Sequence, residues 1–247
     1  MTKHEPGPIF LLSPAHAGGK RAKTLFNPQS QGALARRLQA GEAVTLGELF
    51  SFMSGLYFRG KLAYASRFAA TADDVRVITP QQGLLPASTP FTLPDLAALS
   101  DVPIDPEDDR YRRPLEIDLA ALAAHPSSSP LVLLGSLATG KYLDVLRRPL
   151  GGRLFFPAPF VGLGDMARGS LLLRHAREGV EMAYAPIADL PARAGKRAQP
   201  KKTASREVQT GIAPCSAALG TGAGFGFVCG SRSVRMISLR SVASRGP

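Results

Sequence analysis

Short apolar runs recur along the first three quarters of the chain, and most end at a polar segment that contains glycine or proline. Runs of this kind that are bounded by turn residues predict buried strands. The predicted strands cover residues 8–13, 75–79, 131–135, 153–156 and 181–187.

Between these runs, apolar residues recur at the spacing of an amphipathic helix. The segment 45–70 is predicted to form two helices, because Thr45 and Glu48 have the spacing of a capping box and Gly55 can separate the pieces. Pro114 suits the first turn of a helix over 114–124. The other predicted helices cover residues 29–40, 94–99, 141–147 and 165–177.

Strands and helices therefore alternate along the chain. This alternation predicts a three-layer α/β fold, with a mostly parallel sheet of about five strands and helices on both faces. The proline-rich, acidic stretch 84–114 is long for a connection, and we expect it to act as a cover.

The basic charge is concentrated at the end of the chain. The net charge is +11, but residues 191–247 hold ten Lys or Arg and one acid, Glu207, which makes them +9. We expect an α/β domain over 1–190 and a basic tail, rich in Gly, Ser, Ala and Arg, over 191–247. A segment of this composition is predicted to be disordered, although its charge could also bind a nucleic-acid backbone.

Both cysteines, Cys215 and Cys229, lie in this tail. Their spacing matches no zinc site, and two cysteines in 247 residues form no disulfide framework. We hypothesise that residues 201–247 come from a shifted reading frame rather than from the evolved fold. No run is long and apolar enough for a membrane span, and we expect a cytoplasmic protein without a membrane partner.

The sharpest local motif runs from Gly135 to Tyr142. Its form, G-x-x-x-x-G-K, follows a predicted strand and opens a predicted helix, which is the context of a phosphate-binding loop. Tyr142 replaces the Ser or Thr that would hold magnesium, so an anion-binding loop is a better prediction than a nucleotide triphosphatase. A purely structural glycine turn is the other interpretation. The candidate ligand-binding residues here are Gly135, Ser136, Thr139, Gly140 and Lys141.

A second loop follows the first predicted strand. It offers two glycines and a cation, Gly18, Gly19 and Lys20, as candidate ligand-binding residues. His16 is a candidate proton carrier in the same loop, although a lone histidine in a loop is more often a solvated side chain.

Two further loops carry candidate residues. Gln81 and Gln82 follow the strand 75–79 and could hydrogen-bond a base or a sugar, or belong to an ordinary turn. Asp165 could carry protons or cap a helix, of which the N-cap is favoured, and Arg168 lies one turn later. Because ligands bind at the carboxyl ends of parallel strands, we expect all four loops to form one crevice.

Arg59 and Lys61 lie on a predicted helix that could border this crevice. A solvated helix face is the slightly favoured interpretation of these two cations.

The chain resembles a family of uncharacterised bacterial α/β domains. The resemblance is carried by Leu56–Ala65 (LYFRGKLAYA), by a strand that leads to Gly83-Leu84-Leu85, and by Gly135–Tyr142 and Gly162–Gly169. It covers about residues 8–190 and leaves out the tail. The resemblance implies an α/β fold and a mild preference for nucleotide-type ligands, and it indicates almost nothing about the activity.

We therefore expect the protein to bind a nucleotide-like or other phosphate-bearing small molecule at the carboxyl edge of the sheet. Transferase or glycosyl-bond chemistry is one extension, in which Asp165 or His16 would handle protons. No metal or other cofactor is predicted, and binding without catalysis is equally compatible with these residues. The alternatives are a non-enzymatic, nucleic-acid-associated module that uses the tail, and an interaction protein whose glycine loops are only turns.

Overall fold

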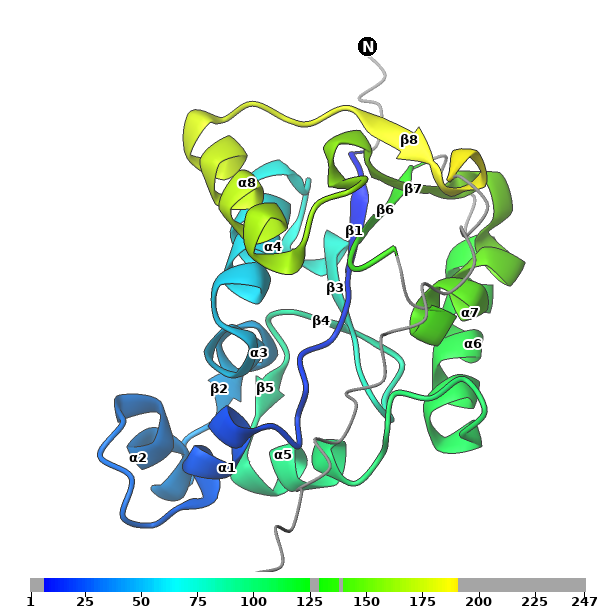
Figure 1. Cartoon of the computed structure of the whole chain (residues 1–247). Coiled ribbons are helices and arrows are strands. Elements are labelled where there is room, and N and C mark those ends of the chain that lie inside the picture. Colours follow the sequence, from blue (N-terminus) through cyan, green and yellow to red (C-terminus); the bar gives the residue numbers. More distant parts are fainter. Residues whose placement is uncertain (1–6, 125–128, 138–139, 191–247) are drawn as a thin grey trace, which may run out of the picture. The chain divides into compact units, whose positions relative to one another are not determined.

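A six-stranded sheet forms the centre of the protein, in the order β4-β3-β1-β6-β7-β8 (Figure 1). The computed structural model describes residues 7–124, 129–137 and 140–190, without the side chains of residues 140 and 141. All of these residues belong to the first of the chain's two units, Met1–Arg197. The whole predicted tail lies outside the described residues, and so does the unit Ala198–Pro247.

Four neighbouring strands run parallel. They are β3 (Val75–Ile78), β1 (Ile9–Leu12), β6 (Leu131–Leu134) and β7 (Leu154–Pro157). The edge strands β4 (Leu84–Pro86) and β8 (Tyr184–Pro186) run antiparallel to their neighbours. Two short strands, β2 (Val44–Thr45) and β5 (Pro90–Phe91), pair separately.

Helices cover both faces of the sheet, so the three-layer α/β prediction is confirmed (Figure 1). The helices α4 (Leu56–Phe68) and α8 (Asp165–Glu178) lie on one face, and α6 (Asp109–Ala124) and α7 (Gly140–Leu150) lie on the other. The remaining helices are α1 (Lys20–Phe26), α2 (Ala33–Gln39), α3 (Leu46–Ser54) and α5 (Leu93–Ser100).

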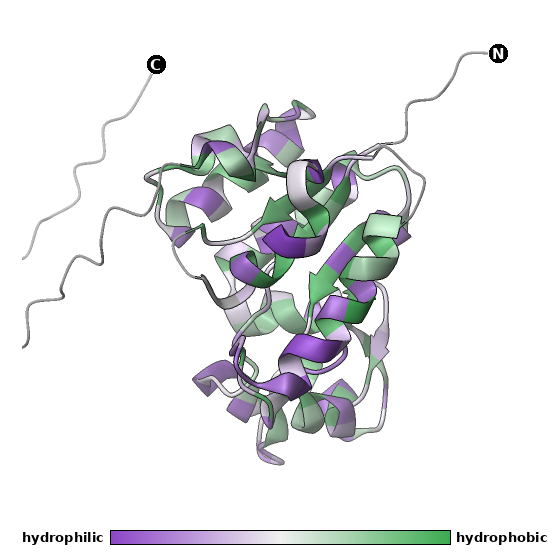
Figure 2. Ribbon diagram, turned by 90° about the vertical axis from the view of Figure 1, so that its right-hand side faces the viewer, coloured by the Kyte–Doolittle hydropathy of each residue, from purple (hydrophilic) through white to green (hydrophobic). Residues whose placement is uncertain are grey.

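The central strands are buried on both faces, which explains their continuous apolar runs. All four residues of β6 and three of the four residues of β1 have no exposed surface. Figure 2 shows the strands as largely hydrophobic, whereas the helices carry both hydrophobic and hydrophilic positions. The rigid centre therefore fixes where the loops after β1 and β6 begin.

The predicted break between two helices in the segment 45–70 is confirmed. Thr45 is the N-cap of α3, and its hydroxyl accepts a hydrogen bond from the backbone N–H of Glu48 at 3.1 Å. Gly55 lies between α3 and α4 with φ of +70°, a conformation that favours glycine. This turn sets the direction in which α4 crosses the sheet.

Two features of the helices differ from the prediction. Helix α6 begins at Asp109, so Pro114 lies inside it and not in its first turn. The earlier start is favoured because Asp109 forms an ion pair with Arg113 at 2.7 Å and because Tyr111 is fully buried. Helix α7 likewise continues through Pro149 to Leu150.

Candidate functional site

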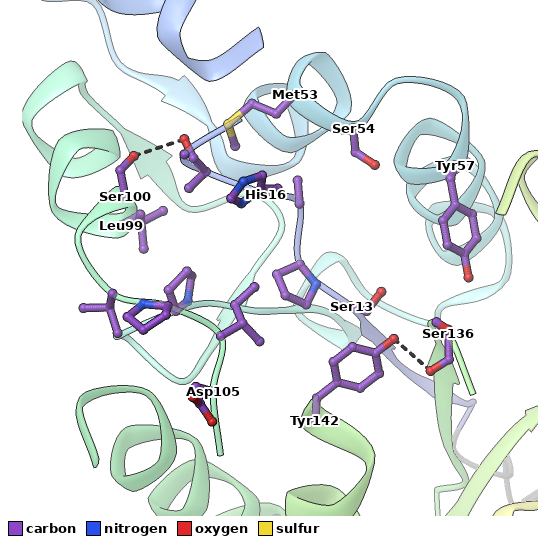
Figure 3. A pocket seen from close by; sticks show the side chains of 18 of the residues that line it. Ser13, His16, Met53, Ser54, Tyr57, Leu99, Ser100, Asp105, Ser136 and Tyr142 are labelled. Atoms are coloured by element: carbon purple, nitrogen blue, oxygen red, sulfur yellow. Dashed lines mark hydrogen bonds between the residues drawn. The ribbon is translucent and has the colours of Figure 1, made fainter. Parts of the chain in front are cut away.

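A cavity of about 820 Å³ opens at the carboxyl ends of β1 and β6. The chain leaves β1 toward β3 on one side and later returns past β1 to β6 on the other side, so the strand order reverses between β1 and β6. Ligands of open α/β sheets bind at this kind of reversal, because the two loops diverge and leave a crevice. Ser13, directly after β1, and Ser136, soon after β6, both line the cavity (Figure 3).

The segment after α5 forms the opposite wall of the cavity. Residues 101–106, from the proline-rich stretch that was expected to act as a cover, all line it. The Ser100 hydroxyl donates a hydrogen bond to the carbonyl of Ala17 at 3.1 Å, which ties the end of α5 to the loop after β1 (Figure 3). The wall contains the apolar side chains of Leu99, Val102 and Ile104 as well as the carboxylates of Asp101 and Asp105.

Lys61 is the most unusual residue of the cavity, because only 1% of its surface is exposed. Its Nζ donates hydrogen bonds to the carbonyl oxygen of Ser13 at 2.7 Å and to the Ser13 hydroxyl at 2.9 Å. The rings of Tyr57 and Phe58 flank Nζ, with centroids 4.5 and 4.9 Å away. No described residue forms an ion pair with Lys61, so its ammonium lacks the counter-charge that buried lysines usually have.

Burial lowers the pKa of Lys61 to about 7, and the Asp165 carboxylate opposes this shift. The physical cause is desolvation, which disfavours the charged form of a buried amine. The side chain therefore exists in comparable amounts as ammonium and as amine near neutral pH. A lysine held in this way is common at functional sites and costly elsewhere.

The Tyr57 hydroxyl is a second unusual group. The residue is 8% exposed, and the hydroxyl has no hydrogen-bond partner among the described residues. Burial raises the pKa of Tyr57 well above its usual value, although the nearby Arg168 guanidinium acts in the opposite direction. The hydroxyl therefore stays protonated, and it points to the side of the cavity where Ser13, Ser136 and Tyr142 lie (Figure 3).

Helix α8 contributes Asp165 and Arg168 to the same region. The Asp165 carboxylate lines the cavity and lies 3.4 Å from the Arg168 guanidinium. Arg168 is buried and donates two hydrogen bonds to the carbonyl of Phe160, at 3.2 and 3.3 Å. Arg168 therefore holds the loop before α8 and orients Asp165, and it is not among the described residues that line the cavity.

A close crossing of α4 and α8 fixes these groups relative to one another. A Cβ atom on Gly60 would lie 2.6 Å from the carbonyl oxygen of Gly169, and one on Gly169 would lie 2.9 Å from Cα of Tyr57. Both distances are too short for a side chain, so glycine at these two positions lets the helix backbones touch. Tyr57 and Lys61 on α4 are thereby brought next to Asp165 on α8.

The inner end of the cavity is equally tight. A Cβ atom on Gly135 would lie 2.9 Å from Cβ of Ser13 and 3.1 Å from the Tyr142 hydroxyl. That hydroxyl donates a hydrogen bond to the carbonyl of Ser136 at 2.9 Å (Figure 3). Gly135 thus shapes the cavity by allowing close packing behind it.

The structure brings together candidate residues from three of the four predicted loops, and the fourth loop, after β3, contributes only Pro80. His16, Gly18, Ser136 and Asp165 line the cavity, and His16 is an exposed side chain there. Asp165 is the first residue of α8 and not its N-cap, which is Gly164, so the favoured capping role is wrong. The carboxylate is therefore left in the cavity.

Other predicted residues lie elsewhere. Gly19, Lys20, Gln81 and Gln82 are not among the described residues that line the cavity. Lys20 is exposed at the start of α1, and the loop after β3 contributes Pro80 and not the two glutamines. The reason is that the backbone N–H of Gln82 and the carbonyl of Gly83 both bond to the Thr79 hydroxyl, which makes a tight turn.

Part of the phosphate-loop motif cannot be placed. Thr139 lies outside the described residues, and so does the side chain of Lys141, while Gly140 is described only as the first residue of α7. The structure does describe the helix after the motif, α7. Ser136 lies before this helix and Tyr142 lies in its first turn, and both residues line the cavity. Helix α7 therefore begins beside the cavity.

The sequence interpretation did not name Tyr57 as a candidate site residue. It did place Lys61 on a helix that could border the crevice, but it slightly favoured a solvated face, although a signal for burial was present. The buried positions of α4 are Tyr57, Phe58, Gly60, Lys61, Tyr64 and Ala65. Lys61 thus lies on the apolar stripe of its helix, four residues after Tyr57 and three before Tyr64, and is not on a solvated face.

Three further observations concern metal ions, membranes and relatives of the chain. Among residues 7–124, 129–137 and 140–190, no group of His, Cys, Asp and Glu is arranged to hold a metal ion. None of the helices in this described part is long and apolar enough to cross a bilayer. Comparisons of the chain with protein-family models, with curated proteins and with solved structures found no match.

Proposed function

We propose that the protein binds a nucleotide-like or other phosphate-bearing small molecule in the cavity at the carboxyl ends of β1 and β6. The observation that carries this proposal is the buried Lys61, which has no ion-pair partner among the described residues. An uncompensated charge costs several kcal/mol to bury, so a ligand that supplies the missing negative charge recovers part of this cost.

Two further features support an anionic ligand. The ammonium of Lys61 has three N–H groups, of which two are bonded to Ser13, and the Tyr57 hydroxyl has no acceptor among the described residues. Helix α7 begins beside the cavity, and the N-terminus of a helix favours a phosphate group through its free N–H groups and its dipole. A phosphate at the start of α7 would leave Lys61 and Tyr57 to hold another oxygen of the ligand.

The opposite wall fits the rest of a nucleotide or a sugar phosphate. Leu99, Val102 and Ile104 offer an apolar surface for a flat ring, and Asp101 and Asp105 offer acceptors for hydroxyl groups. The volume of about 820 Å³ lies within the usual range for small-molecule sites. If the protein is an enzyme, Asp165 is the carboxylate best placed to move a proton, in a transferase or glycosyl-bond reaction.

Thermal unfolding of the full chain with inorganic phosphate, AMP and ribose 5-phosphate tests the proposal. A probe at about 100 times its dissociation constant should add about 2.7 kcal/mol of stability. Lys61→Met, which keeps the volume and removes the charge, should abolish this gain. Arg59→Met is the matched control, because Arg59 is an exposed cation on the same helix; it should keep the gain. If no probe stabilises the protein, or if Lys61→Met responds like the wild type, the proposal is wrong.

A second candidate function rests on the charge distribution. The +9 segment 191–247 favours a module that binds DNA or RNA without sequence specificity. This function needs neither Lys61 nor the cavity, and deletion of the segment separates the two candidates.

A further inference from the structure

The two hydrogen bonds of Lys61 suit an amine as well as an ammonium. Both acceptors, the carbonyl oxygen and the hydroxyl of Ser13, belong to one residue and are 2.7 and 2.9 Å from Nζ. A neutral amine has two N–H groups and one lone pair, so loss of one proton need not break either bond. The lone pair of the amine would then take the place of the third N–H group of the ammonium, which donates to neither oxygen of Ser13.

The surroundings of Nζ favour this neutral form. The residue is 1% exposed, two aromatic rings flank Nζ, and no ion pair with another described residue holds the proton. The ionisable groups that face it are Tyr57 on the same helix and Asp165 and Arg168 on α8, while His16 and Tyr142 line the same cavity. A desolvated lysine amine near neutral pH is a nucleophile toward carbonyl groups.

A proton donor lies one helical turn away. Tyr57 precedes Lys61 by four residues, so both side chains leave the same face of α4, and the ring of Tyr57 is 4.5 Å from Nζ. The Tyr57 hydroxyl is buried, stays protonated and has no acceptor among the described residues. A carbonyl oxygen in the cavity is an acceptor of the kind this hydroxyl lacks.

We propose that Lys61 forms an imine with the open-chain aldehyde of a phosphorylated sugar, and that Tyr57 protonates the oxygen of that aldehyde. The lone pair of Nζ forms a bond to the carbonyl carbon as the C=O π bond breaks. The oxygen takes one proton from Tyr57, and Tyr57 recovers a proton from the nitrogen. The second nitrogen proton passes to the same oxygen, the C–O bond breaks as the nitrogen electron pair forms the second C–N bond, and water leaves. An amine and an aldehyde thus give an imine and water, with no oxidant, reductant or metal.

This inference rests on the proposed function, because the phosphate group would direct the sugar into the cavity. It narrows the ligand class from phosphate-bearing molecules to phosphorylated carbonyl compounds. The hydroxyl groups of a sugar chain would meet carboxylate acceptors at Asp165 and at Asp101 and Asp105 of the opposite wall.

Reductive trapping tests the imine directly. The full chain is incubated with ribose 5-phosphate and sodium cyanoborohydride at pH 7, and the modified peptides are identified by mass spectrometry. We expect the reduced adduct chiefly on Lys61, whereas Lys20 and Lys23, which are exposed on α1, serve as internal controls. The adduct yield should rise from pH 6 to pH 8, and ribose without phosphate should give much less adduct.

Variants assign the roles of the two residues. Tyr57→Phe should slow trapping about tenfold, which corresponds to the loss of one hydrogen bond of about 1.4 kcal/mol, while Arg59→Met should trap at the wild-type rate. Modification spread equally over Lys20, Lys23 and Lys61, or absent from Lys61, overturns the imine. If ribose 5-phosphate gives no adduct on Lys61 but still raises the melting temperature, the proposed binding function stands and only the imine proposal fails. If neither an adduct nor a rise in melting temperature is seen, the binding function and the imine proposal both fail.

Discussion

A single side chain, Lys61, explains why the cavity has the properties of a site and is not merely a packing defect. Its amine lies where β1 ends, and the hydrogen bonds to Ser13 hold it there. Moving a charged group from water into the protein interior is among the largest free-energy costs that a single side chain can add to folding. No carboxylate within the described part of the chain pairs with Lys61 to offset that cost, which is why Lys61 is a better functional candidate than the exposed His16 and Lys20.

The lowered pKa of Lys61 makes the stability of the protein depend on pH. Between the folded-state value of about 7 and the ordinary value of 10.5, the unfolded chain binds more protons than the folded protein at this residue. The free energy of unfolding should therefore rise with pH in this window, by roughly 1.4 kcal/mol per pH unit from Lys61.

Denaturant unfolding of the wild type and of Lys61→Met between pH 7 and pH 10 measures this contribution. The variant should be at least as stable as the wild type at pH 7, and its advantage should shrink as the pH rises. A difference that does not change with pH would mean that Lys61 titrates normally in the folded protein. Arg59→Met should follow the wild type throughout.

The sequence predicted residues of this site only where the pattern of neighbouring residues was enough to place them at the end of a strand or the start of a helix. Ser136 and Asp165 were found because they follow apolar runs, and that placement is a property of the nearby chain. For Lys61 a solvated face was slightly favoured over the border of the crevice, since a charged side chain on a helix is usually solvated. Its burial depends on the packing of α8 over α4, which no local pattern contains.

At the scale of elements, the crossing of α4 and α8 determines the geometry of the site. The helices touch at Gly60 and Gly169, and each glycine lies within one turn of a cavity residue, Lys61 or Asp165. A larger residue at the crossing would push the helices apart and separate the side chains of Lys61 and Asp165.

Gly60→Ala should destabilise the protein by about 1–3 kcal/mol, because the added methyl would overlap the backbone of Gly169. It should also weaken any ligand-induced stabilisation. Gly152→Ala is the control, since a Cβ there meets nothing within 4 Å, and its stability should be unchanged. Circular dichroism melts of the two variants measure the difference; equal melting temperatures would mean that the crossing is less tight than described.

The elements themselves were largely predictable. Periodicity located the parallel strands and most helices within a few residues, because buried strands and amphipathic helices differ in pattern. The short strands β4 and β5 were not found, since they contain two or three residues and begin or end at a proline. The interior position of Pro114 was also missed, because the burial of Tyr111 and Leu115 overrides the preference of proline for a first turn.

At the scale of the whole molecule, the strand order brings distant parts of the chain together. Ser13, Lys61, Ser136 and Asp165 are spread over more than 150 residues and meet at one cavity, because β1 and β6 are neighbours. All four loops border the cavity as expected, but only three of them do so with candidate ligand-binding or proton-carrying residues. The loop after β3 folds into its own turn at Thr79 and contributes Pro80 instead of its glutamines.

Deletion of residues 191–247 separates the two candidate functions of the molecule. The described cavity residues lie between 13 and 165, so the shortened chain should keep both its melting temperature and its stabilisation by ribose 5-phosphate. Binding to a DNA or RNA column at low salt, by contrast, should be lost with the +9 segment. Loss of ligand stabilisation in the shortened chain would show that the segment takes part in the site.

The two outer strands of the sheet have a consequence for how copies of this protein meet. Both β4 and β8 are three residues long and end in proline, at Pro86 and Pro186. Proline lacks the backbone N–H group that would hydrogen-bond to a further strand. An edge strand of three residues has few other backbone groups with which a further strand could pair. At high concentration the folded protein should therefore resist growth into fibrils through its sheet, so that self-association would have to use side chains and not backbone.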